Sequence, residues 1–237
     1  MVRSWLFWTL LPLAVPQALR VRRTAQRFPA APGPNSGSIG DGPEKSLVAI
    51  GDSVAAGVGA GSLDRALVGE TARSLAKKYD CTICWSTHAI VGADSADLLA
   101  DVLPSLPTKP VDLVLISVGV NDITGLRPVG AWRDNLTEVF ERLHQHSPSA
   151  VITMAGVPPL HRFPLLPQPL RWLMGLRAKL LDRAARKVAN EHDYVLYVPL
   201  DVEPDPDAFA DDGFHPSEAS YREMGRHFAD AITIQSR

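Results

Sequence analysis

The sequence predicts an α/β domain built on a parallel sheet that lies between two layers of helices. Short apolar runs alternate along the chain with longer segments of helical periodicity. Runs such as 113–116 are apolar at every position, which is typical of strands covered on both faces. Strands and helices that alternate imply right-handed crossovers between parallel strands. We therefore expect a three-layer α/β/α sandwich with a five-stranded parallel sheet.

The expected elements follow one another from residue 47 to residue 198. The strands are expected at Leu47–Ile50, Cys81–Ser86, Leu113–Val118, Val151–Ala155 and Tyr194–Val198. The helices between them are expected at Ala66–Tyr79, Ser95–Leu103, Ala131–His144 and Met174–His192. In an open parallel sheet, reactive groups gather at the carboxyl ends of the strands. The residues that directly follow each strand are therefore the candidates for a functional site.

Size, charge and cysteine content narrow the classes of function. The 237 residues, 46% of them hydrophobic and 21% charged, suit one globular domain with a modest extension. The formal net charge of -2 offers no basic surplus for a phosphate backbone, so nucleic acid is not an expected partner. Cys81 and Cys84 have the spacing of a redox pair or of half a zinc site, but a second pair of zinc ligands is missing. Residues three apart in a strand point to opposite faces, so we expect two separately packed thiols.

Residues 1–27 differ from the rest of the chain because a mostly apolar stretch is followed by arginines at positions 20, 22, 23 and 27. The apolar stretch is short for a membrane span, which needs about 20 apolar residues. Trp and Leu followed by arginine suit a helix that lies in the bilayer interface. We expect an N-terminal helix in contact with membrane lipid, with the side of the membrane open. The alternatives are a helix packed on a cytoplasmic protein's own surface and a signal peptide for export to the periplasm.

Residues 28–45 are rich in proline and glycine and are expected to form a linker. Such a composition cannot bury enough apolar surface to offset the entropy lost on ordering. The globular domain is then expected to span residues 46–237.

A candidate nucleophile follows the first expected strand, in the segment Gly51-Asp52-Ser53. A hydroxyl placed between a strand and the following helix is held in a fixed orientation, and its own backbone N–H points into the same crevice. Ser53 could therefore act as nucleophile and as oxyanion donor. The triplet by itself is weak support, because Gly, Asp and Ser are common turn residues.

Two further candidates follow the next expected strands. Gly92 can bring its backbone N–H close to a ligand, and Asn121 adds a neutral side-chain donor. Acyl transfer builds negative charge on the former carbonyl oxygen, and fixed N–H donors stabilise that charge. The alternative for both residues is ordinary turn chemistry.

The last candidate element is the segment Asp211-Asp212-Gly213-Phe214-His215. A serine hydroxyl is a poor nucleophile until an imidazole accepts its proton, and the imidazole needs a partner that fixes its tautomer. Asp212 and His215 can supply this orienting acid and this base from one loop. Asp211 remains the alternative acid, because spacing favours Asp212 only slightly.

Taken together, these elements resemble the four marker blocks of the SGNH hydrolases, also called GDSL esterases and lipases. The blocks are the G-D-S triplet that ends at Ser53, Gly92, the G-x-N-D segment that contains Asn121, and the D-x-x-H segment from Asp212 to His215. The resemblance implies a flavodoxin-like fold and a catalytic triad of Ser53, His215 and Asp212. It also implies an oxyanion hole made by the Ser53 N–H, the Gly92 N–H and the Asn121 side chain. No metal or cofactor is expected.

The resemblance covers about residues 47–232 and has two departures. Val54 stands where the named motif has Leu, which is a packing position. Ile90 stands in a neighbourhood where many members of the family carry polar residues, which affects the turn at Gly92.

We expect hydrolysis of carboxylic esters, with small-molecule acyl or lipid-type esters as substrates. Residues 156–174 are dense in proline and carry Phe, Leu, Trp and Met at the catalytic edge. They are expected either to form an apolar wall or lid for an acyl chain, or simply to cover the edge of the sheet. A carbohydrate O-deacetylase and an acyltransferase are alternatives on the same scaffold. An alternative of another class is a catalytically silent, membrane-tethered binding protein. A nucleotide or flavin binder is disfavoured because the first turn lacks a glycine-rich phosphate loop.

Overall fold

A computed structural model describes residues 2–24, 26, 28–200 and 206–234 of the chain. Its centre is a 6-stranded sheet in the order β1-β3-β2-β4-β5-β6. The strands are β1 Ser36–Ile39, β2 Glu44–Gly51, β3 Thr82–Ala89, β4 Leu113–Ser117, β5 Val151–Ala155 and β6 Val195–Val198. The strands from β2 to β6 are parallel, and their order is the one found in flavodoxin-like folds. The prediction of a parallel α/β sheet is confirmed, but the sheet has one strand more than expected.

The additional strand β1 pairs antiparallel with β3 at the edge of the sheet and lies within the segment expected to be a linker. Gly37 allows this pairing, because a Cβ atom there would lie 2.6 Å from the ring of Trp85 on β3. The pairing satisfies backbone hydrogen bonds without burying a run of apolar side chains. Residues 36–39 therefore belong to the sheet and not to a linker, although their composition carries no strand pattern.

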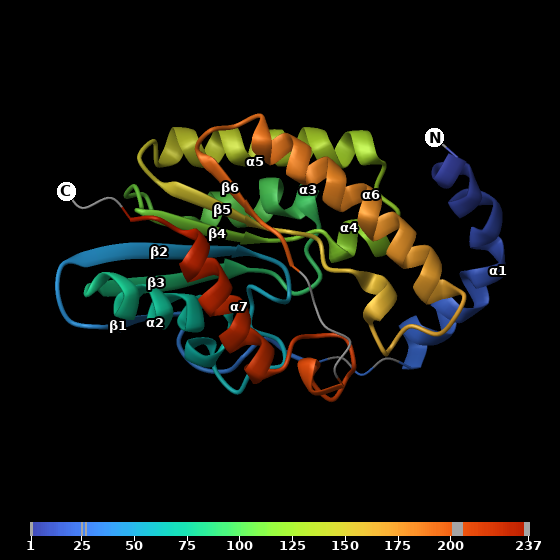
Figure 1. Cartoon of the computed structure of the whole chain (residues 1–237), viewed down its shortest axis with the longest axis horizontal. Coiled ribbons are helices and arrows are strands. Elements are labelled where there is room, and N and C mark those ends of the chain that lie inside the picture. Colours follow the sequence, from blue (N-terminus) through green and yellow to red (C-terminus); the bar gives the residue numbers. More distant parts are fainter. Residues whose placement is uncertain (1, 25, 27, 201–205, 235–237) are drawn as a thin grey trace.

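Two layers of helices cover the sheet (Figure 1). Helices α5 (Val129–His146) and α6 (Leu170–Asn190) cover one face, and α2 (Leu67–Tyr79) and α7 (Glu218–Ala231) cover the other. Alternate residues of β2 supply the two cores: Val48 and Ile50 face the α5–α6 layer, whereas Leu47 and Ala49 face the α2–α7 layer. This division explains why the central strands are apolar at every position.

The remaining helices are short, apart from the first. They are α1 (Val2–Thr24), α3 (Ser95–Asp97), α4 (Val120–Thr124), and the turns η1 (Leu63–Arg65), η2 (Leu98–Val102), η3 (Leu103–Ser105), η4 (Leu160–Arg162) and η5 (Pro206–Ala208). The helix expected at residues 95–103 is thus divided into one α-helical turn, a π-helical segment and a 3₁₀ turn. Cys81 and Cys84 are both free thiols: Cys81 is buried just before β3, and Cys84 is half-buried within it.

Helix α1 packs along α6 through one face. Phe7 and Ala14 are buried in this contact. The side chain of Gln17 donates to the carbonyl oxygen of Gln168 (2.7 Å) and accepts from the N–H of Leu170 (3.1 Å), which anchors α1 at the start of α6. None of the helices in the described part of the chain has the length and apolar character that crossing a membrane requires.

The carboxyl ends of β2 and β4 approach each other very closely, at the point where the strand order of the sheet changes direction. Gly51, the last residue of β2, has φ +148°, and a Cβ atom there would lie 1.9 Å from the carbonyl oxygen of Ser117. The next N–H, that of Asp52, donates to the same oxygen at 3.0 Å. Only glycine permits this approach, which brings the loops after the two strands together.

Replacement of Gly51 by alanine should therefore lower the free energy of unfolding by at least about 2 kcal/mol, because the new methyl group meets backbone at a positive φ. Gly130→Ala is the matched control, since Gly130 is exposed on α5 and a Cβ atom there would have no other atom within 4 Å. That change should leave stability equal or slightly higher. Urea unfolding measures both variants, and equal stabilities would contradict the proposed constraint.

Candidate active site

Ser53 lies in a tightly bonded turn directly after β2. The carboxylate of Asp52 accepts the N–H of Val54 at 3.0 Å, and the carbonyl oxygen of Ser53 accepts the N–H of Val58 at 2.9 Å. These bonds fix the backbone on both sides of the serine. The Ser53 side chain is therefore presented from a rigid position at the carboxyl edge of the sheet.

His215 contacts both Ser53 and Asp212. Its Nε2 atom lies 3.0 Å from Ser53 Oγ, and its Nδ1 atom lies 2.6 Å from Asp212 Oδ2. The other oxygen of Asp212 accepts the N–H groups of Phe214 (2.9 Å) and His215 (3.0 Å). A proton on Nδ1 then donates to the carboxylate, and Nε2 can accept the proton of the serine hydroxyl.

Of the two neighbouring acids that the sequence left open, Asp212 makes this contact. Asp212 is buried, whereas Asp211 is exposed to solvent. The Asp212 carboxylate accepts two backbone N–H groups and contacts the imidazole, so both of its oxygens have partners within the loop.

The loop that carries His215 is held against the loop that carries Ser53. The carbonyl oxygen of His215 accepts the N–H of Ala210 at 2.8 Å, which makes the loop turn back on itself. Tyr221 on α7 donates its hydroxyl to the carbonyl oxygen of Val58 at 2.7 Å. This bond is buried and joins the C-terminal helix to the turn that begins at Ser53.

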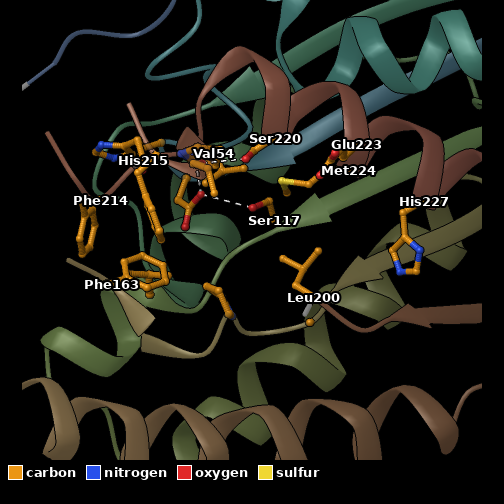
Figure 2. Close-up of a pocket in the computed structure, with 18 of the residues that line it drawn as sticks. Val54, Ser117, Phe163, Leu200, Phe214, His215, Ser220, Glu223, Met224 and His227 are labelled. Carbon is orange, nitrogen blue, oxygen red and sulfur yellow. Dashed lines mark hydrogen bonds between the residues drawn. The ribbon is translucent and has the colours of Figure 1, made fainter. Parts of the chain in front are cut away.

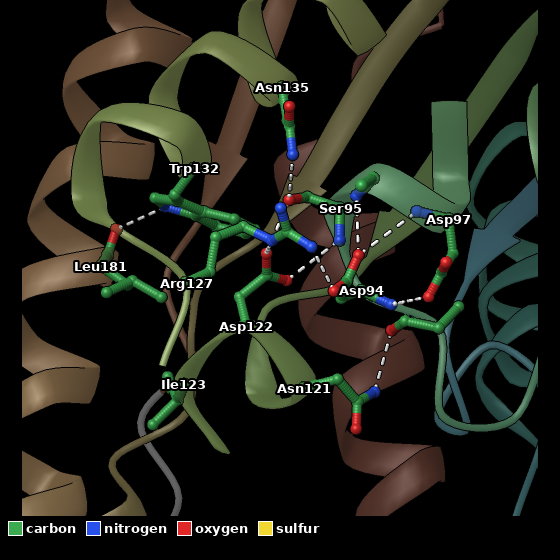
Figure 3. Close-up of polar contacts among 12 residues, drawn as sticks. Asp94, Ser95, Asp97, Asn121, Asp122, Ile123, Arg127, Trp132, Asn135 and Leu181 are labelled. Atoms are coloured by element: carbon green, nitrogen blue, oxygen red, sulfur yellow. Dashed lines mark hydrogen bonds and ion pairs between the residues drawn. The ribbon is translucent and has the colours of Figure 1, made fainter. Parts of the chain in front are cut away.

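Gly92 and Asn121 lie in neighbouring loops. The Asn121 side chain donates to the carbonyl oxygen of Ala93 at 2.9 Å, and this leaves its second N–H available (Figure 3). Gly92 has φ +90° and open space in the direction of a Cβ atom. Within the described part of the chain, no backbone carbonyl accepts the N–H of Ser53 or of Gly92. These groups can therefore donate to a ligand.

A cavity of about 620 Å³ opens beside Ser53 and His215. Figure 2 shows His215 and Phe163 at one end and Leu200, Met224 and His227 at the other. Most of the side chains along it are apolar, and Gly92 and Asn121 are not among its lining residues. The apolar residues come from four parts of the chain: Val54, Val118, Val120, Pro158, Phe163, Pro199, Leu200, Ala208, Phe209, Phe214, Pro216, Ala219 and Met224.

The proline-dense segment 156–174 contributes side chains both to the lining of the cavity and to the core. Pro158 and Phe163 line the cavity, and Phe163 packs edge-on against Phe209 and Phe214. The leucines of the segment at positions 160, 166, 170 and 173 are buried in the core, because η4 and the start of α6 fold them inward. Trp172 points to solvent and does not reach the cavity.

Sequence comparison identifies the family. The GDSL-like Lipase/Acylhydrolase family matches residues 49–223, which contain all of the site residues described above. The chain belongs to this family.

One protein of similar sequence and two solved structures of similar fold are compared with this chain. The GDSL-like esterase Rv1075c of Mycobacterium tuberculosis is 32% identical over 183 residues, which are 74% of this chain and 57% of that protein. This chain thus matches little more than half of its relative's length. The structure resembles the lipase Lip_vut3 from a goat rumen metagenome (TM-score 0.61, 17% identity, covering 79% and 97% of the two chains). It also resembles a family two carbohydrate esterase from Clostridium thermocellum (TM-score 0.63, 17% identity, covering 80% and 63%).

A polar network that the sequence did not predict joins the loops of the GDSL-family site (Figure 3). Asp122 accepts the N–H (3.1 Å) and the hydroxyl (2.6 Å) of Ser95. The Nε atom of Arg127 lies 2.8 Å from Oδ1 of Asp122, and the guanidinium also forms an ion pair with Asp94. The loop after Gly92 is therefore tied to the loop that contains Asn121. Asp122 is visible in the G-x-N-D block, but Arg127 lies in no motif.

Burial changes the acidity of two carboxyl groups at this edge of the sheet. Burial raises the pKa of Asp52 to about 7, and the neighbouring Asp122 adds to this effect. Burial likewise raises the pKa of Asp122 to about 6, although hydrogen bonds from Ser95 and the charge of Arg127 oppose the shift. Both carboxyl groups are therefore harder to ionise than an exposed aspartate.

Arg127→Gln should lower the free energy of unfolding at pH 8 by about 3 kcal/mol, because it leaves the buried carboxylate of Asp122 without its cation. The control is Arg142→Gln, which removes a half-exposed ion pair with Glu138 and should cost about 0.5 kcal/mol or less.

Adding Asp122→Asn to Arg127→Gln should recover part of the loss, since the unpaired buried charge is then gone. Urea unfolding of the four proteins measures these differences. Equal losses for Arg127→Gln and Arg142→Gln would contradict the role assigned to the network.

Proposed function

We propose that this chain hydrolyses carboxylic esters with Ser53 as nucleophile, His215 as general base and Asp212 as the acid that orients the imidazole. The observation that carries the proposal is the unbroken chain of contacts from Ser53 Oγ through His215 to Asp212, at 3.0 Å and 2.6 Å. Family membership supports it independently. Each contact lies within the range that proton transfer requires.

The reaction follows from this geometry. His215 Nε2 takes the proton of the Ser53 hydroxyl as Oγ attacks the ester carbonyl carbon. The resulting tetrahedral intermediate collapses when the alcohol leaves, taking that proton from the imidazolium. Water then gives a proton to the same nitrogen and attacks the acyl-enzyme, and release of the carboxylic acid returns the proton to Ser53. Asp212 stabilises the imidazolium that forms in both halves of the reaction.

The oxyanion hole is proposed to comprise the N–H groups of Ser53 and Gly92 and the side chain of Asn121. In the described part of the chain, the N–H groups of Ser53 and Gly92 donate to no backbone carbonyl. The Asn121 side chain donates one N–H to Ala93 and has a second N–H for the oxyanion. Donors fixed before the reaction stabilise the developing charge without reorganisation. The network of Asp94, Asp122 and Arg127 supports the proposal, because it restrains two of the three donor loops.

The proposed substrates are acyl or lipid-type esters. An apolar cavity beside the nucleophile suits an acyl chain, and in its wall Phe163 packs edge-on against Phe209 and Phe214. The carbohydrate O-deacetylase alternative has no comparable support in the lining of this cavity.

A fluorophosphonate probe tests the nucleophile. Wild-type protein should gain the mass of one phosphonyl group, and Ser53→Ala should gain none and lose about 10⁴-fold or more in kcat for p-nitrophenyl esters. His215→Gln should label much more slowly than wild type. Ser62→Ala is the control, because Ser62 lies nearby on the chain and its side chain makes no capping bond. Labelling of Ser53→Ala at the wild-type rate would contradict the assignment of Ser53 as the nucleophile.

Esters of increasing acyl length test the substrate class. If the cavity binds the acyl chain, kcat/KM should rise from acetate to hexanoate or octanoate p-nitrophenyl esters by about tenfold or more, since each buried methylene contributes about 0.8 kcal/mol. Met224→Trp should narrow the cavity and remove the preference for long chains while sparing acetate turnover. Highest activity on acetylated sugars, with no dependence on chain length, would contradict the acyl assignment.

A further inference from the structure

We propose that the outward side of α1 docks on the surface of an anionic lipid bilayer. We call this side the α1 outer face, and it comprises Leu13, Val15, Leu19, Arg20, Arg22 and Arg23. The inference concerns binding and goes beyond the proposed reaction at Ser53.

The α1 outer face is defined by how the opposite side of the helix is held. Phe7 is 2% exposed and Ala14 is fully buried against the body of the protein, and the guanidinium of Arg177 lies over the Phe7 ring at 5.5 Å. Gln17 bonds to two backbone groups at the start of α6. These contacts set the rotation of the helix about its axis, so the outer residues cannot turn inward to escape water.

Large apolar side chains are left on the α1 outer face. Leu13 is 69% exposed, Leu19 is 48% exposed and Val15 is 43% exposed. They are half of the exposed large hydrophobic residues in the described part of the chain, and Leu13 is the most exposed of all. Three large apolar side chains exposed within two turns of one helix form an apolar patch, and such patches are typical of binding surfaces.

The other exposed large hydrophobic residues lie at the same end of the molecule. Trp172, 42% exposed, is in the first turn of α6, where Gln17 anchors α1. Ile90 and Val91 directly follow β3, at the carboxyl edge of the sheet. Figure 1 shows α1 and the start of α6 together at this end. Apolar exposure is thus concentrated on the side of the sheet that carries Ser53.

The positive charge of the α1 outer face favours an anionic lipid surface as its partner. Arg20, Arg22 and Arg23 are all exposed and follow the apolar residues directly, and the sequence of α1 contains no acidic residue. A helix in the bilayer interface places apolar side chains among the acyl chains and arginines at the phosphate level. Because one face of α1 packs along α6, the helix would lie along the surface of the bilayer.

Docking through this face would hold the carboxyl edge of the sheet near the lipid. A membrane ester or a partitioned acyl ester would then reach the cavity beside Ser53 over a short path. This consequence rests on the proposed ester hydrolysis, whereas docking itself does not.

Vesicle flotation of the full chain tests the proposal. Wild-type protein should bind vesicles of phosphatidylcholine and phosphatidylglycerol more tightly than vesicles of phosphatidylcholine alone. Replacement of Arg20, Arg22 and Arg23 by glutamine should weaken binding to the anionic vesicles by about tenfold or more. Leu13→Ser combined with Leu19→Ser should weaken it by at least about tenfold as well, through loss of apolar burial.

Two controls keep the outcomes distinct. A protein with Lys77, Lys109 and Arg222 replaced by glutamine loses the same charge from other exposed positions and should bind like wild type. Ser53→Ala should also bind like wild type, so that a failure of the proposed hydrolysis leaves the docking result intact. The proposal is overturned if wild-type protein stays with the soluble fraction for both vesicle types. It is equally overturned if the α1 variants and the charge-matched control bind alike.

Discussion

The site depends on the close approach of the carboxyl ends of β2 and β4. Because Gly51 has no side chain, its backbone contacts Ser117, and the Asp52 N–H bonds to the same carbonyl oxygen. The carbonyl oxygen of Gly51 also accepts the N–H of Ile90 at 3.1 Å. The loops after β2, β3 and β4 thus converge on one residue. The loops that carry Ser53, Gly92 and Asn121 are far apart in the sequence, and they are joined there as a consequence of sheet order and not of any local motif.

The histidine reaches this edge by a different route. It lies 162 residues from Ser53 along the chain, in a loop after the last strand. One local and one long-range hydrogen bond position it: the loop folds back through the Ala210–His215 bond, and Tyr221 ties α7 to the carbonyl oxygen of Val58. Docking of α7 on α2 therefore contributes to the geometry of the nucleophile as well as to the core. Changes in that packing are expected to disturb the contact between Ser53 and His215.

Features that arise from burial or from motifs were predictable from the sequence, and features that arise from tertiary contacts were not. The parallel strands could be predicted because both of their faces are covered. Ser53, Gly92, Asn121 and His215 could be proposed as site residues because they follow strands or stand in marker blocks. Strand β1 was missed because edge pairing at Gly37 needs no apolar pattern. Arg127 was missed because its function comes from two carboxylates that approach it only in the fold. The choice between Asp211 and Asp212 likewise depended on which one the loop buries.

We propose, in sum, that the loops after β2, β3 and β4 form one preorganised site around Ser53. A crystal structure of the protein after reaction with a fluorophosphonate tests this claim most directly, because the phosphonyl oxygen stands in for the oxyanion. We expect phosphorus bonded to Ser53 Oγ and its free oxygen within about 3 Å of the Ser53 N–H, the Gly92 N–H and the Asn121 side chain. An adduct whose oxygen points into solvent or toward the cavity, away from Gly92 and Asn121, would contradict it.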